Sequence, residues 1–290
     1  TSLKRMSLLS FIIFPFHLYV KFGGSIDYIS MDYIGVFFLL GRNRQATNIV
    51  HDFMYRHIPK YFSRFNYRNF LAVSALDVVI FMSLLRARVW FVSESTFVDC
   101  PSLIKIGIKD SIVSPPFFYE QASEGEVSDM SYLPDDYCLF VGSDRPQKGL
   151  KRIIGSLDEL RKCGMTLVVI GGGAYSENSR LDCVFLQNLS EKEYYSVLSG
   201  SRCLLVPSLY EGYCIPIAEA IIHDIPVISS GEGALTEWDN GLVDTCNFDN
   251  SSIWIKKASE LPCNLMRHGV NISFISLLKA QFVDAGSFLL

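Results

Sequence analysis

The sequence predicts an α/β fold in which helices cover a parallel β-sheet. From Cys138 onward, short apolar runs alternate with longer amphipathic segments, which is the pattern of strand–helix–strand units. Loops rich in glycine and charged residues follow several of these runs, as expected where a parallel sheet presents a ligand-binding edge. We therefore expect a doubly wound, Rossmann-like domain in this half of the chain.

The strands and helices of this domain follow from apolar runs and helical spacing. The expected strands are Cys138–Val141, Thr166–Ile170, Cys183–Leu186, Cys203–Val206 and Pro226–Ser229. The expected helices are Gly149–Cys163, which carries apolar residues at helical spacing, Glu191–Ser199 and Pro216–Ile222.

The chain before residue 121 is less regular. Thr47–Val50 and Val89–Val92 have the composition of strands, and Asn69–Leu85 that of a mostly buried helix. Residues 121–136 are polar and acidic, which favours a linker. We therefore expect an N-terminal domain over residues 1–120 and a second domain over 137–270. A C-terminal helix over 271–290 would pack back on the N-terminal domain.

Composition restricts the function classes. The 290 residues are 49% hydrophobic and carry a net charge of −4, with Lys and Arg scattered along the chain. This distribution argues against nucleic-acid binding. The eight cysteines form no C-x-x-C pair, and several lie in apolar runs, as free thiols do in a reducing compartment. We therefore expect a cytoplasmic protein.

The N-terminal apolar run Leu8–Val20 follows Lys4 and Arg5 and imitates a signal peptide, but no small-residue cleavage site follows it. It is shorter than the roughly 20 residues that a spanning helix needs. We expect a buried element or a patch in peripheral contact with the inner face of a membrane. The chain starts with Thr, as a processed product or a fragment would.

The segment from Pro207 to Ala220 has the features of an anion site. It follows an apolar strand, and Pro216 suits the first turn of a helix. A loop that enters a helix presents unpaired N–H groups, which together with the helix dipole favour a diphosphate. Glu211 and Glu219 flank this site and could accept hydrogen bonds from sugar hydroxyls.

Two further loops follow strands of the same expected sheet. After Gly142, Arg145 and Lys148 bring positive charge that could neutralise a diphosphate leaving group. After Ile170 comes the run that starts at Gly171, and glycines allow close approach of backbone to a ligand. Taken singly, each of these features is typical of an ordinary turn or surface. Their occurrence at successive strand ends favours a ligand site.

Together these residues resemble the retaining glycosyltransferases of family 4, which have the GT-B fold of two Rossmann-like domains. The hallmark of that family is two glutamates separated by seven residues within P-S-x-x-E-G-F-G-x-P-x-x-E-A. This chain reads P-S-L-Y-E-G-Y-C-I-P-I-A-E-A, followed by D-I-P-V-I-S. Cys214 replaces the second glycine, and Ser143 stands where many members have Arg. The glycine-rich loop expected well upstream of His51 is absent, so we expect a shortened N-terminal domain.

The resemblance implies roles for the donor-site residues. Glu211 would contact the donor sugar, Glu219 the ribose, and Lys148 the diphosphate, with Arg145 as a helper. The strand-end glycines Gly142 and Gly171 would lie beside the donor. The remaining expected donor-site residues are Tyr213, Cys214 and Ile215 at the sugar phosphate and Leu186 and Gln187 near the base.

The first half resembles the same family in two short segments. Asn48–Asp52 (N-I-V-H-D), followed by Pro59, is similar to its V-H-D segment, and Val92–Ser95 is similar to its V-S-E-x-S. The resemblance places His51 near the donor sugar. A structural pair between His51 and Asp52 is an equally good interpretation.

The implied reaction is transfer of a hexose, with retention, from a GDP- or UDP-linked donor to a glycan or lipid-linked acceptor in surface polysaccharide biosynthesis. The chain contains no D-x-D triplet, so we expect neither a metal nor another cofactor. Two alternatives remain: a non-catalytic nucleotide-sugar-binding subunit or truncated product, and a nucleotide-sugar epimerase with the GT-B fold.

Overall fold

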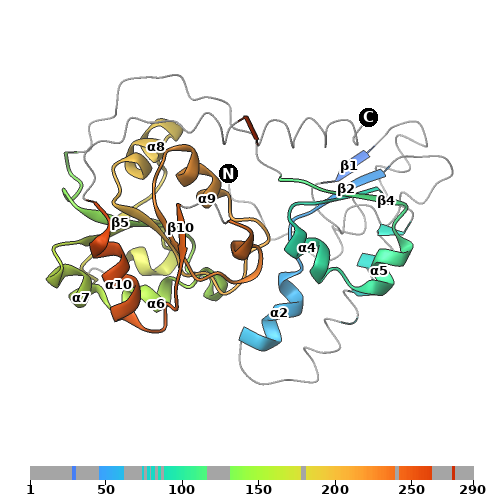
Figure 1. The fold of residues 1–290 in the computed structure, drawn as a ribbon, viewed down its shortest axis with the longest axis horizontal. Helices are drawn as coiled ribbons and strands as arrows, with labels where there is room; N and C mark the ends of the chain where they lie inside the picture. The colour runs from blue at the N-terminus through green and yellow to red at the C-terminus, as the bar shows by residue number, and fades with distance from the viewer. Residues whose placement is uncertain are drawn as a thin grey trace. The chain divides into compact units, whose positions relative to one another are not determined.

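The computed structural model describes residues 28–30, 46–61, 74, 77–78, 80–81, 84–85, 88–115, 131–177, 181–238, 242–262 and 276–277. The chain divides into two compact units, one made of Thr1–Pro116 and Gln281–Leu290 and one that runs from Phe117 to Ala280 (Figure 1). Most of the expected linker over 121–136 and of the expected helix over 271–290 lies outside the described residues.

The C-terminal unit contains a parallel sheet with the strand order β10-β9-β8-β5-β6-β7. Its strands are β5 (Tyr137–Gly142), β6 (Thr166–Gly171), β7 (Val184–Leu186), β8 (Cys203–Val206), β9 (Val227–Ser229) and β10 (Val243–Thr245). The five strands predicted from apolar runs are confirmed to within one residue. Sequence analysis missed β10, because this short edge strand is half-exposed and has no apolar run.

The strand order reverses between β5 and β8. From β5 the sheet grows through β6 to β7 in one direction, and from β8 it grows through β9 to β10 in the other. Doubly wound sheets bind their ligands outside the carboxyl ends of the strands at such a switch point. The loops that follow β5 and β8 therefore occupy the binding edge.

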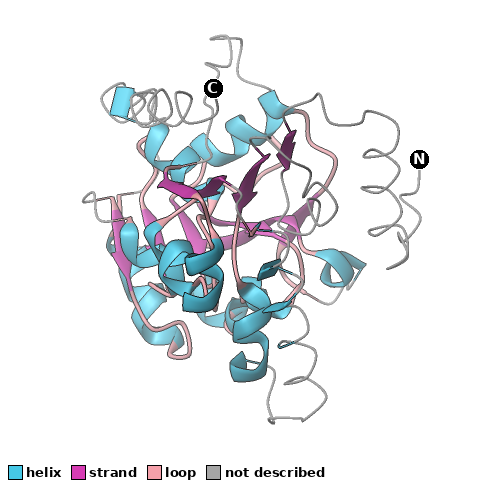
Figure 2. Cartoon of the chain, turned by 90° about the vertical axis from the view of Figure 1, so that its right-hand side faces the viewer, coloured by secondary structure: helices cyan, strands magenta, loops and turns pink. Residues whose placement is uncertain are grey.

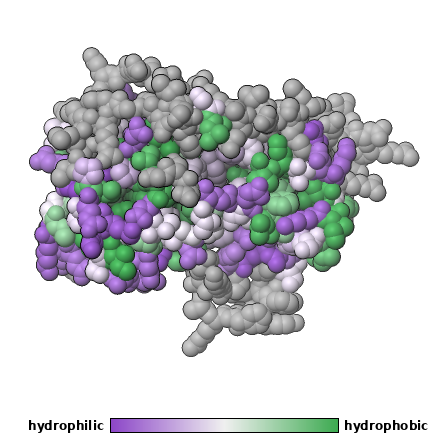
Figure 3. All heavy atoms as spheres, viewed as in Figure 1, coloured by the Kyte–Doolittle hydropathy of each residue, from purple (hydrophilic) through white to green (hydrophobic). Residues whose placement is uncertain are grey.

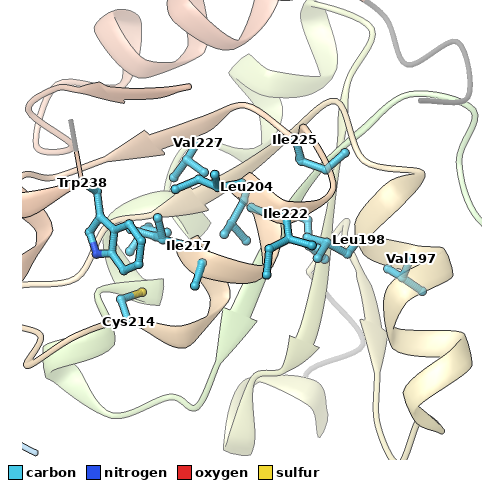
Figure 4. Packing of buried hydrophobic residues seen from close by; sticks show 14 of the residues in the cluster. Val197, Leu198, Leu204, Cys214, Ile217, Ile222, Ile225, Val227 and Trp238 are labelled. Atoms are coloured by element: carbon cyan, nitrogen blue, oxygen red, sulfur yellow. The ribbon is translucent and has the colours of Figure 1, made fainter. Parts of the chain in front are cut away.

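Helices cover both faces of this sheet (Figure 1). On one face lie α6 (Leu150–Ile154), α7 (Leu157–Lys162) and α10 (Ser251–Glu260), and on the other α8 (Glu191–Ser199) and α9 (Ile215–Ile222). Figure 4 shows how Ile217 and Ile222 of α9 and Leu198 of α8 pack against Leu204 and Val227 of the sheet.

The predicted single helix over Gly149–Cys163 is wrong, because the segment forms α6 and α7 with a break between them. Gly155 and Ser156 lie at the break, and both residue types are weaker helix formers than the residues around them. The N–H of Ser156 bonds to the carbonyl of Ile153, three residues back, instead of continuing the α-helical pattern.

The N-terminal unit contains a second parallel sheet, in the order β1-β2-β3-β4. Its strands are β1 (Tyr28–Ser30), β2 (Ala46–Val50), β3 (Arg88–Phe91) and β4 (Asp110–Val113), and its helices include α2 (Met54–Tyr61), α4 (Glu94–Asp99) and α5 (Ser102–Gly107). Figure 2 shows the strands in magenta and the helices in cyan.

Both strands predicted in this half are confirmed, as β2 and β3. The polar, half-exposed β4 was missed for the same reason as β10. The expected helix over Asn69–Leu85 is described at six helical residues and a final turn, and the rest of it lies outside the described residues. Among the helices that the structure describes, none combines the length and the apolar character required to cross a bilayer.

Candidate functional site

An ion pair joins the two loops at the switch point. Lys148 ends the short 3-10 helix η1 (Pro146–Lys148) after β5, and Glu211 lies in the loop after β8. The Nζ of Lys148 lies 2.8 Å from Oε1 and 3.0 Å from Oε2 of Glu211. Ser208 Oγ donates a hydrogen bond of 2.7 Å to the same Oε1. The Lys148 side chain is 31% exposed and that of Glu211 11%, so a solvent-borne anion can reach the lysine.

Two hydrogen bonds to backbone carbonyls fix the distance between these loops. The N–H of Leu209 donates to the carbonyl of Gln147 at 2.7 Å, and Arg152 Nη1 donates to the carbonyl of Pro207 at 2.8 Å. Gly149 has a left-handed φ of 72°, and a Cβ there would lie 2.1 Å from the Pro207 oxygen. The loops can approach this closely because Gly149 has no side chain.

The loop after β6 lies beside the loop after β5. Gly142 and Gly171, the last residues of β5 and β6, are register partners, and the N–H of Gly172 donates to the Gly142 carbonyl at 2.8 Å. The Asp144 carboxylate accepts from the N–H of Ala174 at 3.0 Å. The two glycine-bearing strand ends that sequence analysis singled out are therefore adjacent.

Arg145 differs from Lys148 in its surroundings. Its side chain is exposed, and it makes no ion pair with any residue that the structure describes. Arg145 and Lys148 lie at opposite ends of one 3-10 turn. Both cations therefore belong to the loop that borders the switch point.

Cys214 immediately precedes helix α9 and has a strained conformation. Its φ of 74° and ψ of 75° lie in the left-handed region, where a side chain costs roughly 1–2 kcal/mol. This geometry explains why glycine is the residue that the motif favours at this position. Burial raises the pKa of the Cys214 thiol, and the neighbouring Glu211 carboxylate raises it further, so the thiol stays neutral.

The residues around Cys214 place the start of α9. Trp238 Nε1 donates to the carbonyl of Tyr213 at 2.9 Å, and the two rings lie 4.9 Å apart. Ile215, the first residue of α9, is 47% exposed. The first N–H groups of a helix have no partner within the helix, so this exposed end can receive an anion.

Glu219 lies within α9 and faces α8. Tyr194 donates a hydrogen bond of 2.5 Å to Glu219 Oε2, and Tyr195 makes a longer contact of 3.5 Å with Oε1. Burial raises the pKa of the Glu219 carboxyl, and the hydrogen bonds from the two tyrosines oppose this shift. Sequence analysis identified Glu219 but neither tyrosine.

The two residues expected near the nucleotide base differ in how exposed their side chains are. The side chain of Leu186 is buried in the core, so its backbone alone is available to a ligand. Gln187 is exposed, and its Nε2 donates to Ser176 Oγ at 2.7 Å.

His51 belongs to the N-terminal unit, whereas the other predicted site residues belong to the C-terminal unit. The side chain of Asp52 accepts from the N–H of Met54 at 2.9 Å and so caps α2. No hydrogen bond joins His51 to Asp52 among the described residues. A His–Asp pair in this unit is instead His57 with Asp99, at 2.9 Å. The role of His51 stays a prediction.

Ser208 and Tyr194 were not predicted from the sequence, and they differ in whether a local pattern could have indicated their contacts. Ser208 precedes Glu211 by three residues, so a local turn could have suggested their contact. Tyr194 and Glu219 are 25 residues apart in different helices. Their contact depends on the packing of α8 beside α9, for which the sequence has no local signal.

The sequence model of the family described as "Glycosyl transferases group 1" matches residues 130–238. A curated relative, the MMP alpha-(1->4)-mannosyltransferase of Mycolicibacterium hassiacum, is 39% identical over 49 residues. That match spans 17% of this chain and 12% of the mannosyltransferase.

Solved structures show the same fold over the whole chain. The sucrose-phosphate synthase of Thermosynechococcus elongatus matches 99% of this chain and 79% of its own, with a TM-score of 0.73 and 14% identity. The UDP-forming alpha,alpha-trehalose-phosphate synthase of Burkholderia vietnamiensis matches 100% of this chain and 80% of its own, with a TM-score of 0.69 and 14% identity. The chain therefore has the GT-B fold, and its residues 130–238 match the sequence model of the glycosyl transferases group 1 family.

Proposed function

We propose that this chain transfers a hexose from a GDP- or UDP-linked donor to a glycan or lipid-linked acceptor, with retention of anomeric configuration. The observation that carries the proposal is the Lys148–Glu211 pair at the switch point of the C-terminal sheet. It brings a cation suited to a diphosphate and a carboxylate suited to sugar hydroxyls to one edge.

Lys148 has two roles in this proposal. Without donor, its Nζ is held by both oxygens of Glu211. When a diphosphate binds, the lysine shares its charge with the phosphate oxygens, and Glu211 accepts hydrogen bonds from hydroxyls of the sugar. The exposed Arg145 adds a second positive charge at the other end of η1. These cations would neutralise the leaving group without a metal or another cofactor.

The proposed chemistry is a front-face displacement. The acceptor oxygen forms a bond to the anomeric carbon from the side on which the bond to the diphosphate oxygen breaks. The acceptor proton passes to an oxygen of the departing nucleoside diphosphate. Negative charge grows on that diphosphate in the transition state, where Lys148 and Arg145 stabilise it.

The names of the relatives support a sugar as the transferred group. One is a mannosyltransferase, and another is a UDP-forming synthase. We further propose that the N-terminal unit carries the acceptor, with His51 at the donor sugar, in surface polysaccharide biosynthesis such as that of lipopolysaccharide, O-antigen or capsule. The apolar residues 8–20, which lie outside the described part, would give peripheral contact with the inner face of the membrane.

The test uses three variants of the full chain with tritiated GDP- and UDP-hexoses and a panel of glycan and lipid-linked acceptors. Glu211→Ala and Lys148→Met should each lower transfer at least about 100-fold, because each removes a group that acts on the transition state. Glu260→Ala is the matched control, since it breaks an exposed Lys256–Glu260 pair on α10 and should leave transfer unchanged.

Four outcomes would contradict parts of the proposal. Unchanged turnover in Glu211→Ala would refute the site assignment. Donor binding without transfer would favour the non-catalytic subunit, and isomerised sugar without transfer would favour the epimerase. Loss of transfer in EDTA, restored by a divalent cation, would refute the metal-free part.

A further inference from the structure

Tyr194 and Tyr195 are neighbours on α8, yet they contact Glu219 very differently. The hydroxyl of Tyr194 lies 2.5 Å from Oε2, a distance typical of a strong O–H donor to a charged carboxylate. The hydroxyl of Tyr195 lies 3.5 Å from Oε1, at the outer limit of a hydrogen bond. One carboxylate oxygen is therefore firmly held, while the other retains most of its capacity to accept.

The surroundings of Glu219 make this hydrogen bond important. Glu219 itself is half-buried on α9, and a carboxylate that loses contact with water without gaining a donor is costly. The groups that act on it are Tyr194, Tyr195 and Glu191 from α8 and Cys214 from α9.

His223, which follows the last residue of α9, packs against Tyr195 with the ring centroids 5.0 Å apart and the ring planes tilted by 36°. Burial lowers the pKa of His223, which favours its neutral form. The described residues thus place no ion pair on Glu219. Hydrogen bonds hold this carboxylate in place.

We propose that Tyr194 is a positioning residue of the nucleotide-sugar site, whose hydroxyl holds Oε2 of Glu219 and leaves Oε1 to accept from a ribose hydroxyl of the donor. The inference rests on the proposed function, because it assumes a nucleotide donor at α9. Tyr194 acts through Glu219 and does not touch the reacting atoms. The contact also connects α8 to α9 across the face of the sheet on which both helices pack.

The inference is tested with Tyr194→Phe and the matched control Tyr195→Phe. Both variants remove one hydroxyl from adjacent residues of the same helix, and both retain the aromatic ring. Binding of UDP and of GDP to the full chain is measured by calorimetry between pH 5 and 8.5. Tyr194→Phe should weaken binding about tenfold at pH 7.5, which is the effect of losing one hydrogen bond to a charged group. Tyr195→Phe should change binding less than twofold.

The pH dependence separates positioning from a merely structural role. The Tyr194 hydroxyl favours the ionised form of Glu219, so its removal should raise the pKa of the carboxyl. As pH falls, nucleotide binding should therefore be lost at a higher pH in Tyr194→Phe than in the wild type. Equal pH profiles in the wild type and Tyr194→Phe would overturn the inference, as would equal effects of the two variants.

A ligand-free measurement distinguishes failure of this inference from failure of the proposed function. The Glu219 carboxyl is titrated by carbon-13 NMR, with its signal assigned by loss in Glu219→Gln. The midpoint should rise further in Tyr194→Phe than in Tyr195→Phe, because the hydrogen bond from Tyr194 is the shorter of the two. An unmoved midpoint would overturn the positioning role alone. Absence of UDP and GDP binding by the wild type would overturn the proposed function, and with it the ribose contact.

Discussion

Both units contain a parallel sheet, but the polar groups of the two sheets differ in their hydrogen bonding. At the strand ends of the C-terminal sheet, charged groups are tied into neighbouring loops and helices: Asp144, Lys148, Glu211 and Glu219 all make hydrogen bonds. In the N-terminal sheet, Asn48 is fully buried in β2, and neither atom of its amide has a partner among the described residues.

The units also differ in how they expose apolar side chains. Val98, Leu103 and Ile106 on α4 and α5 are each at least 70% exposed. Figure 3 shows hydrophobic atoms gathered over α5. The same sheet architecture therefore supports an interlocked polar edge in one unit and a strand with an unpartnered buried amide in the other. Loop-to-loop contacts, not the sheet itself, give the C-terminal edge its defined geometry.

The largest effect on stability should come from disrupting the close approach of Gly149 to Pro207. Gly149→Ala would place a Cβ 2.1 Å from the Pro207 carbonyl oxygen at a left-handed φ. We expect a loss of roughly 3 kcal/mol or more in the free energy of unfolding, measured by urea denaturation. Gly155→Ala is the control, because a Cβ there meets nothing within 4 Å. Equal stability of the two variants would show that the loops do not depend on this approach.

Replacement of Asn48 should have an intermediate effect on the free energy of unfolding, and this effect should be a gain in stability. Asn48→Leu replaces two unpartnered buried polar atoms by apolar ones of similar size. We expect the free energy of unfolding to rise by about 1–3 kcal/mol in the same urea experiment. The contrasting variant is Ser208→Ala, which removes a hydroxyl bonded to Glu211 and should lower stability by about 1 kcal/mol. Destabilisation by Asn48→Leu would mean that the amide has a partner in the folded protein.

The smallest effect should be the difference in stability between two substitutions of Cys214. Cys214→Gly and Cys214→Ala both remove the buried thiol, but alanine alone keeps a Cβ at φ 74°. The glycine variant should therefore be more stable than the alanine variant by about 1 kcal/mol, measured as the difference in urea unfolding. Alanine equal to or better than glycine would contradict a strained helix start.

Much of the C-terminal unit was predictable because its signals are local. Apolar runs located β5 to β9, since a strand buried on both faces must be apolar along its length. The same rule failed for β4 and β10, whose exposed edges need no apolar run. The break between α6 and α7 was missed, because helical spacing continues across Gly155 and Ser156.

By itself, the sequence determined the order of strands and loops and the presence of two glutamates, Glu211 and Glu219, around one helix start. Only the tertiary structure decided which groups touch. Lys148 and Glu211 are 63 residues apart and meet because the strand order reverses between β5 and β8. Tyr194 reaches Glu219 because α8 and α9 pack on the same face of the sheet. Local patterns encode secondary structure through side-chain periodicity, whereas these pairs depend on the path of the chain through space.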